Sequence, residues 1–250
     1  MAFWTLYKRE LNAYFQSAVA YVVLFGSALV QGIFFVILVS VVVGNNIKEA
    51  SVMQIYFTWP LFWILLIVQV PLITMRLFSE EFKLGTIEML LTAPVSEWEI
   101  VLAKFFGALT FFSILWAPIA LDLTALQLFS NPAPPVYWSQ IGLTAMTVAL
   151  AGGFYASLGL FTSVLTKNQI IAAVLSMAFI LAFFGISLFR FVQHIDASTL
   201  AVISYVSLPE ALQNAGVGLF DTRPIVFYVS MTALMLFLTY QVFQYRRWKV

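Results

Sequence analysis

The sequence contains no cysteine, a single histidine and few charged residues. Charged side chains account for 9% of its 250 residues and hydrophobic ones for 62%, whereas about 25% of the residues in a soluble domain are charged. The absence of cysteine excludes disulfides and thiolate metal sites. A net charge of +1 gives no reason to expect a nucleic-acid partner. The composition therefore predicts an integral membrane protein in contact with the lipid bilayer.

Long uncharged runs separate the few charged residues. Since a helix needs about 20 apolar residues to cross a bilayer, these runs predict six membrane-spanning helices, near residues 19–43, 55–75, 103–128, 140–165, 169–189 and 225–244. The longest run is divided by the segment 130–135, whose three prolines break helices. Transmembrane strands would instead alternate apolar and polar residues. We therefore predict an all-α integral membrane protein with a single transmembrane domain over residues 1–250.

The basic residues predict the orientation of the chain. With the amino terminus inside, nine of the twelve basic residues fall inside, whereas Lys48, Arg190 and Arg223 fall outside. Cytoplasmic loops carry an excess of Lys and Arg. We therefore expect both termini to be cytoplasmic.

The sequence also lacks the residue sets of common catalytic sites. No G-x-x-x-x-G-K-[ST] loop is present, so the chain cannot hydrolyse ATP by that route. Glu80 and Glu81 are adjacent, as in some intramembrane metalloproteases, but such a site also needs histidine ligands. The single histidine, His194, falls in a segment predicted outside, and a serine nucleophile would lack a base. We expect no catalytic residue, metal site or cofactor in this chain.

Residues 1–17 precede the first span and are amphipathic. On a helical wheel, Phe3, Tyr7 and Tyr14 share one arc, and Lys8 and Asn12 lie opposite. Aromatic residues with Lys and Arg suit the headgroup region. We predict an interfacial helix that turns into the first span near residue 17; a simple extension of that span is the alternative.

Residues 76–104 concentrate charge between the second and third spans. A charged side chain in lipid costs at least ~3 kcal/mol, so this segment is predicted to lie outside the bilayer, on the cytoplasmic side. We expect Ser79 to cap a short helix with Glu80 and Glu81 in its first turn. Gly85 then permits the chain to reverse.

A second short helix is expected after this reversal. Thr86 can cap it, Pro94 ends it, and Ser96 with Glu99 forms a capping box for the next helix. Three apolar residues would form an exposed ridge on one side, namely Ile87, Leu90 and Leu91. Such ridges bind partners, although an ordinary interfacial loop carries similar residues.

Three further features lie in or beside the later spans. Pro118 can kink the third span, and Asp122 lies about 27 Å beyond Lys104 at roughly 1.5 Å per residue. These two residues are candidates for a substrate path, with an interfacial carboxylate as the alternative. In the fourth span, small residues recur every four positions, at Ala145, Ala149, Gly153 and Ser157; they predict a close-packed seam. Residues 190–224 are expected to form short helices or a re-entrant hairpin outside the cell.

The run from Glu80 to Phe105 resembles the first cytoplasmic loop of type-2 ATP-binding-cassette (ABC) permeases, the six-span subunits of bacterial exporters. The residues that carry this resemblance are Glu80, Glu81, Gly85, Thr86, Leu90, Leu91, Pro94, Val95, Ser96 and Lys104. The carboxyl-terminal residues 218–248 resemble the final segment of the same family. The subgroup of gliding-motility and nitrous-oxide-reductase-maturation permeases is the most similar.

This resemblance implies a function. Residues 87–92 would form a coupling helix that docks in a separate ATPase subunit, with Glu80, Glu81 and Glu88 facing that partner. The partner would bind ATP and Mg, a second permease copy or a homologous permease would complete the path, and a periplasmic accessory protein could contact residues 190–224. The location would be the inner membrane of a bacterium. An ion-coupled secondary transporter and a non-transporting membrane scaffold subunit are the alternatives.

Overall fold

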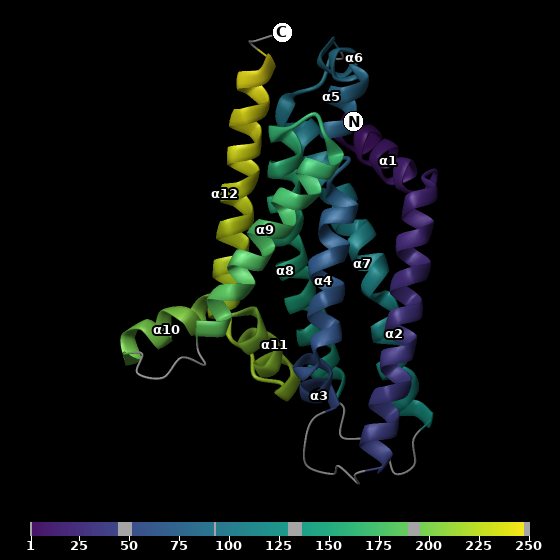
Figure 1. The fold of residues 1–250 in the computed structure, drawn as a ribbon, viewed down its shortest axis with the longest axis vertical. Coiled ribbons are helices and arrows are strands. Elements are labelled where there is room, and N and C mark those ends of the chain that lie inside the picture. The colour runs from purple at the N-terminus through teal and green to yellow at the C-terminus, as the bar shows by residue number, and fades with distance from the viewer. Residues whose placement is uncertain (1, 45–51, 93, 130–136, 190–195, 248–250) are drawn as a thin grey trace.

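The computed structural model describes residues 2–44, 52–92, 94–129, 137–189 and 196–247, and every regular element within these ranges is a helix (Figure 1). Six of the described helices belong to segments long and apolar enough to cross a membrane. They are α2 (Ala18–Gly44), α4 (Pro60–Thr74), α7 (Glu97–Phe129), α8 (Trp138–Leu165), α9 (Gln169–Leu188) and α12 (Thr222–Arg247). The prediction of an all-helical membrane protein with six spans is confirmed. The proline-rich segment 130–135 lies outside the described residues.

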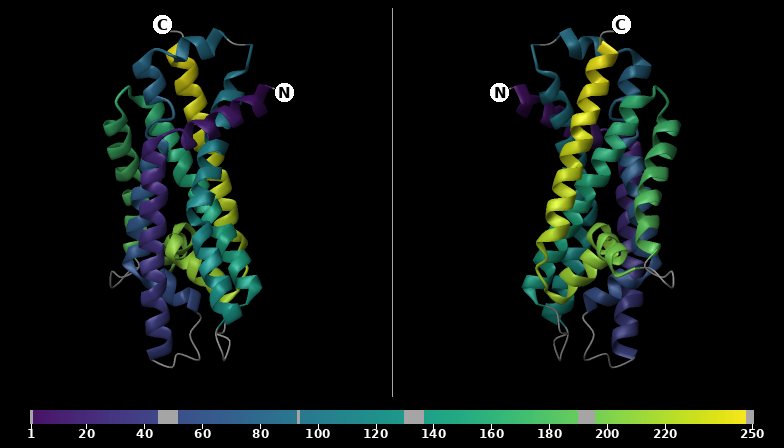
Figure 2. Two further views of the ribbon diagram at one scale, coloured as in Figure 1. Left: turned by 90° about the vertical axis from the view of Figure 1, so that its right-hand side faces the viewer. Right: turned by 90° about the vertical axis from the view of Figure 1, so that its left-hand side faces the viewer.

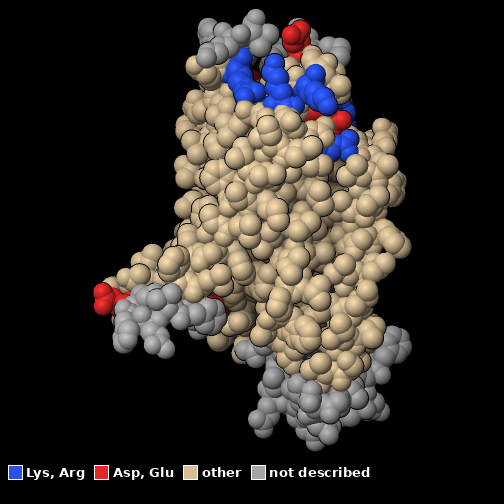
Figure 3. Space-filling view, viewed as in Figure 1, with Lys and Arg blue, Asp and Glu red and all other residues tan. Residues whose placement is uncertain are grey.

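Shorter helices occupy the two ends of the bundle. One end carries α1 (Ala2–Phe15), α5 (Ser79–Leu84) and α6 (Ile87–Thr92), and both chain termini lie beside it. The other end carries α3 (Val52–Thr58), α10 (Ala197–Val206) and α11 (Leu208–Val217). Figure 3 shows Lys and Arg gathered at the first end and an uncharged surface along the middle of the molecule. We call the end that carries α1, α5 and α6 the charged end, and the end that carries α3, α10 and α11 the opposite end.

The first helix is separate from the first span. α1 ends at Phe15, and the backbone N–H of Ser17 donates to the carbonyl of Tyr14 before α2 begins. Figure 2 shows α1 lying across the bundle axis instead of continuing along it. The break confirms the prediction of two helices and excludes a single extended span.

The second span differs from the prediction, which ran without interruption over 55–75. Trp59 has an extended backbone, with φ −82° and ψ 135°, and Pro60 begins α4 behind it. Proline has no N–H and disfavours helical geometry in the preceding residue. The predicted span is therefore divided into α3 and α4.

α8 is the central helix, packed against α4, α7, α9, α11 and α12. Gly152 and Gly159 give it its closest neighbours: a Cβ at Gly152 would lie 2.1 Å from the Phe112 ring, and one at Gly159 2.0 Å from the Thr74 hydroxyl. Small residues let helix backbones approach closely in lipid. The seam predicted in this span is internal, but Ala145 is exposed and the tightest approaches lie at these two glycines.

The opposite end is packed mainly by apolar and aromatic side chains. Phe34 meets the Tyr56 ring edge-on at 4.5 Å, and Phe57 meets Phe62 in the same way at 4.9 Å. α11 packs against α3 and α8 and buries Leu212 completely. The short helices expected between the fifth and sixth spans are therefore present in the described part of that segment.

Candidate functional site

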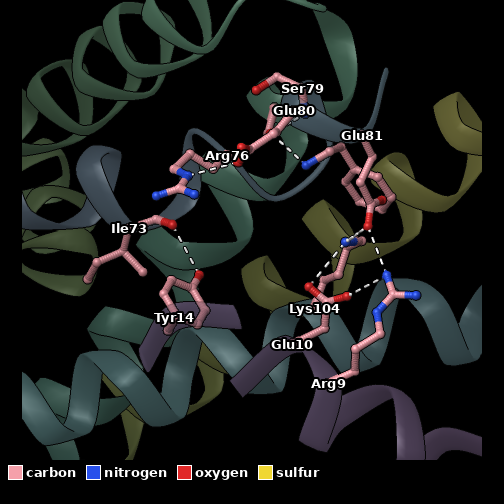
Figure 4. Close-up of polar contacts among 11 residues, drawn as sticks. Arg9, Glu10, Tyr14, Ile73, Arg76, Ser79, Glu80, Glu81 and Lys104 are labelled. Carbon is pink, nitrogen blue, oxygen red and sulfur yellow. Dashed lines mark hydrogen bonds and ion pairs between the residues drawn. The ribbon is translucent and has the colours of Figure 1, made fainter. Parts of the chain in front are cut away.

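A buried lysine lies at the centre of the charged end. Lys104, two turns into α7, is only 1% exposed. Its Nζ donates to Glu81 Oε1 at 2.8 Å and to Glu10 Oε2 at 3.2 Å, and it lies 5.3 Å from the centre of the Phe78 ring (Figure 4). A buried charge is tolerated only when opposite charges and hydrogen bonds compensate for lost hydration. The two carboxylates, from α5 and α1, supply that compensation.

A fourth charge completes this arrangement. Arg9 Nη2 lies 3.0 Å from Glu81 Oε1 and 3.2 Å from Glu10 Oε1. Arg9, Glu10, Glu81 and Lys104, which we call the charge cluster, thus hold two positive and two negative groups. The cluster joins α1, α5 and α7, which are far apart in the sequence.

A second polar contact set lies where α4 leaves the bundle. Arg76 Nε donates to Glu80 Oε2 at 2.8 Å, and the same guanidinium donates to the hydroxyl of Ser17. Tyr14 donates its hydroxyl to the carbonyl of Ile73 at 3.0 Å (Figure 4). Burial, and after it the nearby Glu10, raises the pKa of Tyr14 above its usual value, so this hydroxyl remains a neutral donor. These contacts fix the α1–α2 junction to the end of α4.

α5 is anchored on α8 by a single serine, Ser163, which no sequence pattern singles out. The Oγ of Ser163 accepts the backbone N–H groups of Phe78 at 3.0 Å and Ser79 at 3.1 Å, and it donates to the carbonyl of Met75 at 3.2 Å. The first N–H groups of a helix have no partner within the helix. Ser163 accepts the two N–H groups at the start of α5, where Phe78 is the N-cap residue, so the prediction that Ser79 caps α5 is wrong; the Ser79 hydroxyl donates to the carbonyl of Met75 instead.

The end of α12 also contacts α5 and α7. The Phe243 ring lies 5.1 Å from Phe78, and the Arg246 guanidinium lies 4.9 Å above the Phe82 ring. Trp98 of α7 stacks on Tyr240 at 4.4 Å, with the ring planes 11° apart. α5 is therefore linked to α1, α7, α8 and α12.

The turns around α6 follow the predicted local signals. Gly85 adopts φ +72°, the left-handed geometry that ends α5 and favours glycine. The backbone N–H of Ser96 donates to Glu99 Oε2 at 2.9 Å, and the N–H of Glu99 donates to Ser96 Oγ at 3.3 Å. The reversal at Gly85 and the capping box are confirmed. Thr86 lies half-buried between α5 and α6, and Pro94 is exposed in the bend beyond α6.

The exposed apolar ridge is not found. Ile87 is 6% exposed and Leu90 5% exposed, because these residues join the hydrophobic core of the chain itself. The side chain of Leu91 lies outside the described residues. At the outer surface of this segment are instead Leu84, which is 66% exposed, and Glu88.

The two adjacent glutamates also differ from the expectation that they face a partner. Glu81 belongs to the charge cluster, with a side chain 16% exposed, and Glu80 pairs with Arg76. The buried Lys104 requires a carboxylate such as Glu81, and Arg76 pairs with Glu80, so both glutamates have partners within the chain. Of the three glutamates, Glu88 is exposed, whereas Glu80 and Glu81 are partly buried.

The candidate substrate-path residues lie elsewhere. α7 continues through Pro118, and Asp122 is half-buried farther along the same helix. A cavity of about 220 Å³ lies between α7 and α8, but its walls include the neighbours Ile119 and Leu123 in place of these two residues. A substrate role for Pro118 and Asp122 stays a prediction. Among the described residues, no group of three or more His, Cys, Asp or Glu side chains is placed to hold a metal.

When the chain is compared with known protein families, one family matches it. The model described as "ABC-2 family transporter protein" matches residues 12–208, which is more than half of the chain and includes α2 to α9 and the charge cluster except its two α1 residues. No curated protein matches the chain.

Proposed function

This chain belongs to the ABC-2 transporter family, and we propose that it is the permease subunit of an exporter whose ATP hydrolysis takes place in a separate subunit. Family membership makes it a transmembrane subunit of an ABC transporter. The partner subunit would bind ATP and Mg, and a second permease copy would complete the path at the interface between copies. The exporter would be bacterial and would lie in the inner membrane, as the resemblance implies.

The observation that carries the proposal is the set of links around α5. A force applied to α5 and α6 reaches α1 and α7 through the charge cluster, α8 through Ser163, and α12 through Phe243. Energy from an ATPase must reach the spans through such contiguous packed contacts. The segment after the second span therefore has the connections of a coupling element.

The orientation follows from the distribution of charge. Among the described basic residues, Arg223 lies at the start of α12, at the opposite end, whereas the others lie on α1 and α5 or near the ends of spans that meet the charged end. The excess of basic residues on the cytoplasmic side of membrane proteins favours the charged end as the cytoplasmic one. An ATPase using cytoplasmic ATP would then meet α5 and α6.

The docking surface is revised by the burial of Ile87 and Leu90. These residues hold α6 on the permease, so the ATPase would contact the exposed groups beside them. Leu84 and Glu88 offer one apolar and one acidic contact. Glu80 and Glu81 would act within the permease, through Arg76 and Lys104.

The test is co-purification with an ABC ATPase subunit from the same organism, sought first among the genes beside this one. We expect Leu84→Asp to reduce ATPase retention on tagged permease at least tenfold while the permease yield in membranes is unchanged. Leu219→Asp is the matched control, because Leu219 is similarly exposed at the opposite end. Leu90→Asp should lower the yield of folded permease itself, since it buries an unpaired charge. Normal ATPase retention and normal ATP turnover in a Leu84→Asp, Glu88→Lys double variant would overturn the proposed surface.

A further inference from the structure

A pocket of about 290 Å³ opens at the charged end between α1, α2, α4 and α5. Part of its wall is apolar and comes from the ends of two spans, through Val19, Val23 and Leu72. Toward the end of the bundle the lining becomes charged, with Arg76 and Glu80 following α4. The order from apolar wall to charged rim along the spans is the order from acyl chain to headgroup in a bilayer.

The charges that line this pocket balance. They are three cations and three carboxylates, namely Arg9, Arg76, Lys104, Glu10, Glu80 and Glu81. A ligand with a net negative charge would bring an uncompensated charge beside three carboxylates, and a net positive one would meet three cations. Partly buried charges are tolerated when they are paired. The lining therefore favours a ligand that carries one charge of each sign.

Arg76 and Glu80 are the ion pair in this lining whose two members are both accessible to such a ligand, because the more exposed Arg9 pairs with the largely buried Glu10 and Glu81. The side chains of Arg76 and Glu80 are 31% and 35% exposed, and they lie 2.8 Å apart. A guanidinium has five N–H donors, of which the contacts described here use one toward Glu80 and one toward Ser17. A phosphodiester beside Arg76 and an ammonium beside Glu80 would form a ring of four alternating charges, with hydrogen bonds between charged groups.

We propose that this pocket binds a zwitterionic phospholipid of the phosphatidylethanolamine kind. Its phosphodiester pairs with Arg76, its ammonium pairs with Glu80, and one acyl chain follows Val19 and Val23 along α2. The bound lipid joins the α1–α2 junction to α5 and so becomes part of the charged end. Exposed basic residues elsewhere on this end attract anionic lipids, but the pocket differs from them in its equal number of carboxylates.

The test uses purified permease in detergent and needs no ATPase, so it is independent of the proposed function. Lipid retention is measured by native mass spectrometry during titration with dioleoyl-phosphatidylethanolamine, dioleoyl-phosphatidylglycerol or glycerophosphoethanolamine. We expect the zwitterionic lipid to be retained at least tenfold more tightly than the anionic one, and the headgroup without chains not to bind at the same concentrations. Equal retention of the two lipids, tighter retention of phosphatidylglycerol, or displacement by glycerophosphoethanolamine would each overturn the proposal.

Two matched pairs of variants locate the site. Val19→Trp fills the pocket and should reduce retention at least tenfold, whereas Val22→Trp, on the same helix but away from the pocket, should not. Arg76→Gln should reduce retention similarly, and Arg223→Gln at the opposite end should not. Because Val19 is 42% exposed, its substitution leaves the folded core intact even if Arg76→Gln does not fold. Undiminished retention in Val19→Trp would contradict the assignment.

Discussion

The two ends of this bundle are held together by different interactions. At the charged end, α1, α5 and α7 meet through ion pairs that depend on each partner, with Lys104 between two carboxylates. At the opposite end, α3, α4 and α11 meet through aromatic and aliphatic packing. Apolar packing tolerates many substitutions of similar volume, but removing one member of a buried ion pair leaves a charge without compensation. The charged end is therefore the part whose arrangement small changes can shift most.

Labelling tests whether the two ends lie on opposite sides of the membrane, and it gives an all-or-none result. The chain has no cysteine, so each introduced cysteine gives a signal without background. Ser96→Cys at the charged end and Ser198→Cys at the opposite end both replace exposed residues. We expect an impermeant thiol reagent to label Ser198→Cys on intact cells and Ser96→Cys only after the membrane is opened. Labelling of Ser96→Cys on intact cells would place the charged end outside and remove the proposed ATPase contact.

Lys104→Met tests the dependence of the charged end on its ion pairs. The substitution removes the buried one of the two cations that Glu10 and Glu81 share and leaves them only Arg9, whose side chain is 53% exposed, so we expect a loss of about 3–5 kcal/mol in the free energy of unfolding. Leu212→Met, at a fully buried position of the opposite end, should cost less than about 1.5 kcal/mol. Chemical denaturation of purified protein, followed by circular dichroism, measures both.

A rescue variant distinguishes the charge effect from a loss of packing. Adding Glu10→Gln and Glu81→Gln to Lys104→Met removes the two carboxylates that have lost their buried cation, and it should recover part of the lost stability. If the triple variant is less stable than Lys104→Met, the cluster is held by something other than charge compensation, and the comparison between the two ends fails.

Glycine substitutions in α8 should give the smallest effects and test the packing between the ends. An added Cβ at Gly159 meets Thr74, whose hydroxyl already donates to Val70 at 2.8 Å. We expect Gly159→Ala to lower the free energy of unfolding by about 1–3 kcal/mol. Gly142→Ala, with no atom within 4 Å of the added Cβ, should be neutral or stabilising by up to about 1 kcal/mol. Equal unfolding midpoints for the two variants would show that α4 and α8 are not closely packed at Gly159.

Local signals in the sequence predicted most of the fold. The six spans follow from run length and apolarity, and the reversal at Gly85 and the Ser96 capping box follow from short patterns. Contacts between distant residues could not be predicted in this way. Glu10 and Lys104 are 94 positions apart, and Ser163 and Phe78 are 85 apart. A buried lysine does require a carboxylate, but the sequence offers several, and only the packing of α1 on α7 selects Glu10.

Because local patterns do not predict contacts between distant residues, they also failed to predict which side of α6 is exposed. A short helix with apolar residues on one side can turn that side toward a partner or toward its own chain. Periodicity is identical in the two cases, and it led to the prediction of an exposed ridge at Ile87 and Leu90. In the structure, contacts with the rest of the chain bury Ile87 and Leu90. Leu84 at the end of α5 and Glu88 of α6 are then exposed residues of this segment.

The position of Lys104 also has a consequence for how the protein is made. Chains are synthesised from the amino terminus, so Glu10 and Glu81 leave the ribosome before Lys104 does. The two carboxylates are thus already present when α7 enters the bilayer, and they meet the lysine as the helix reaches its final depth. The Lys104 ammonium would cost energy at any greater depth in the lipid, and it gains its two carboxylate partners at one depth only. It would therefore fix the depth of α7 in the membrane. Lys104, Glu10 and Glu81 would in this way set the register of α7 in the membrane.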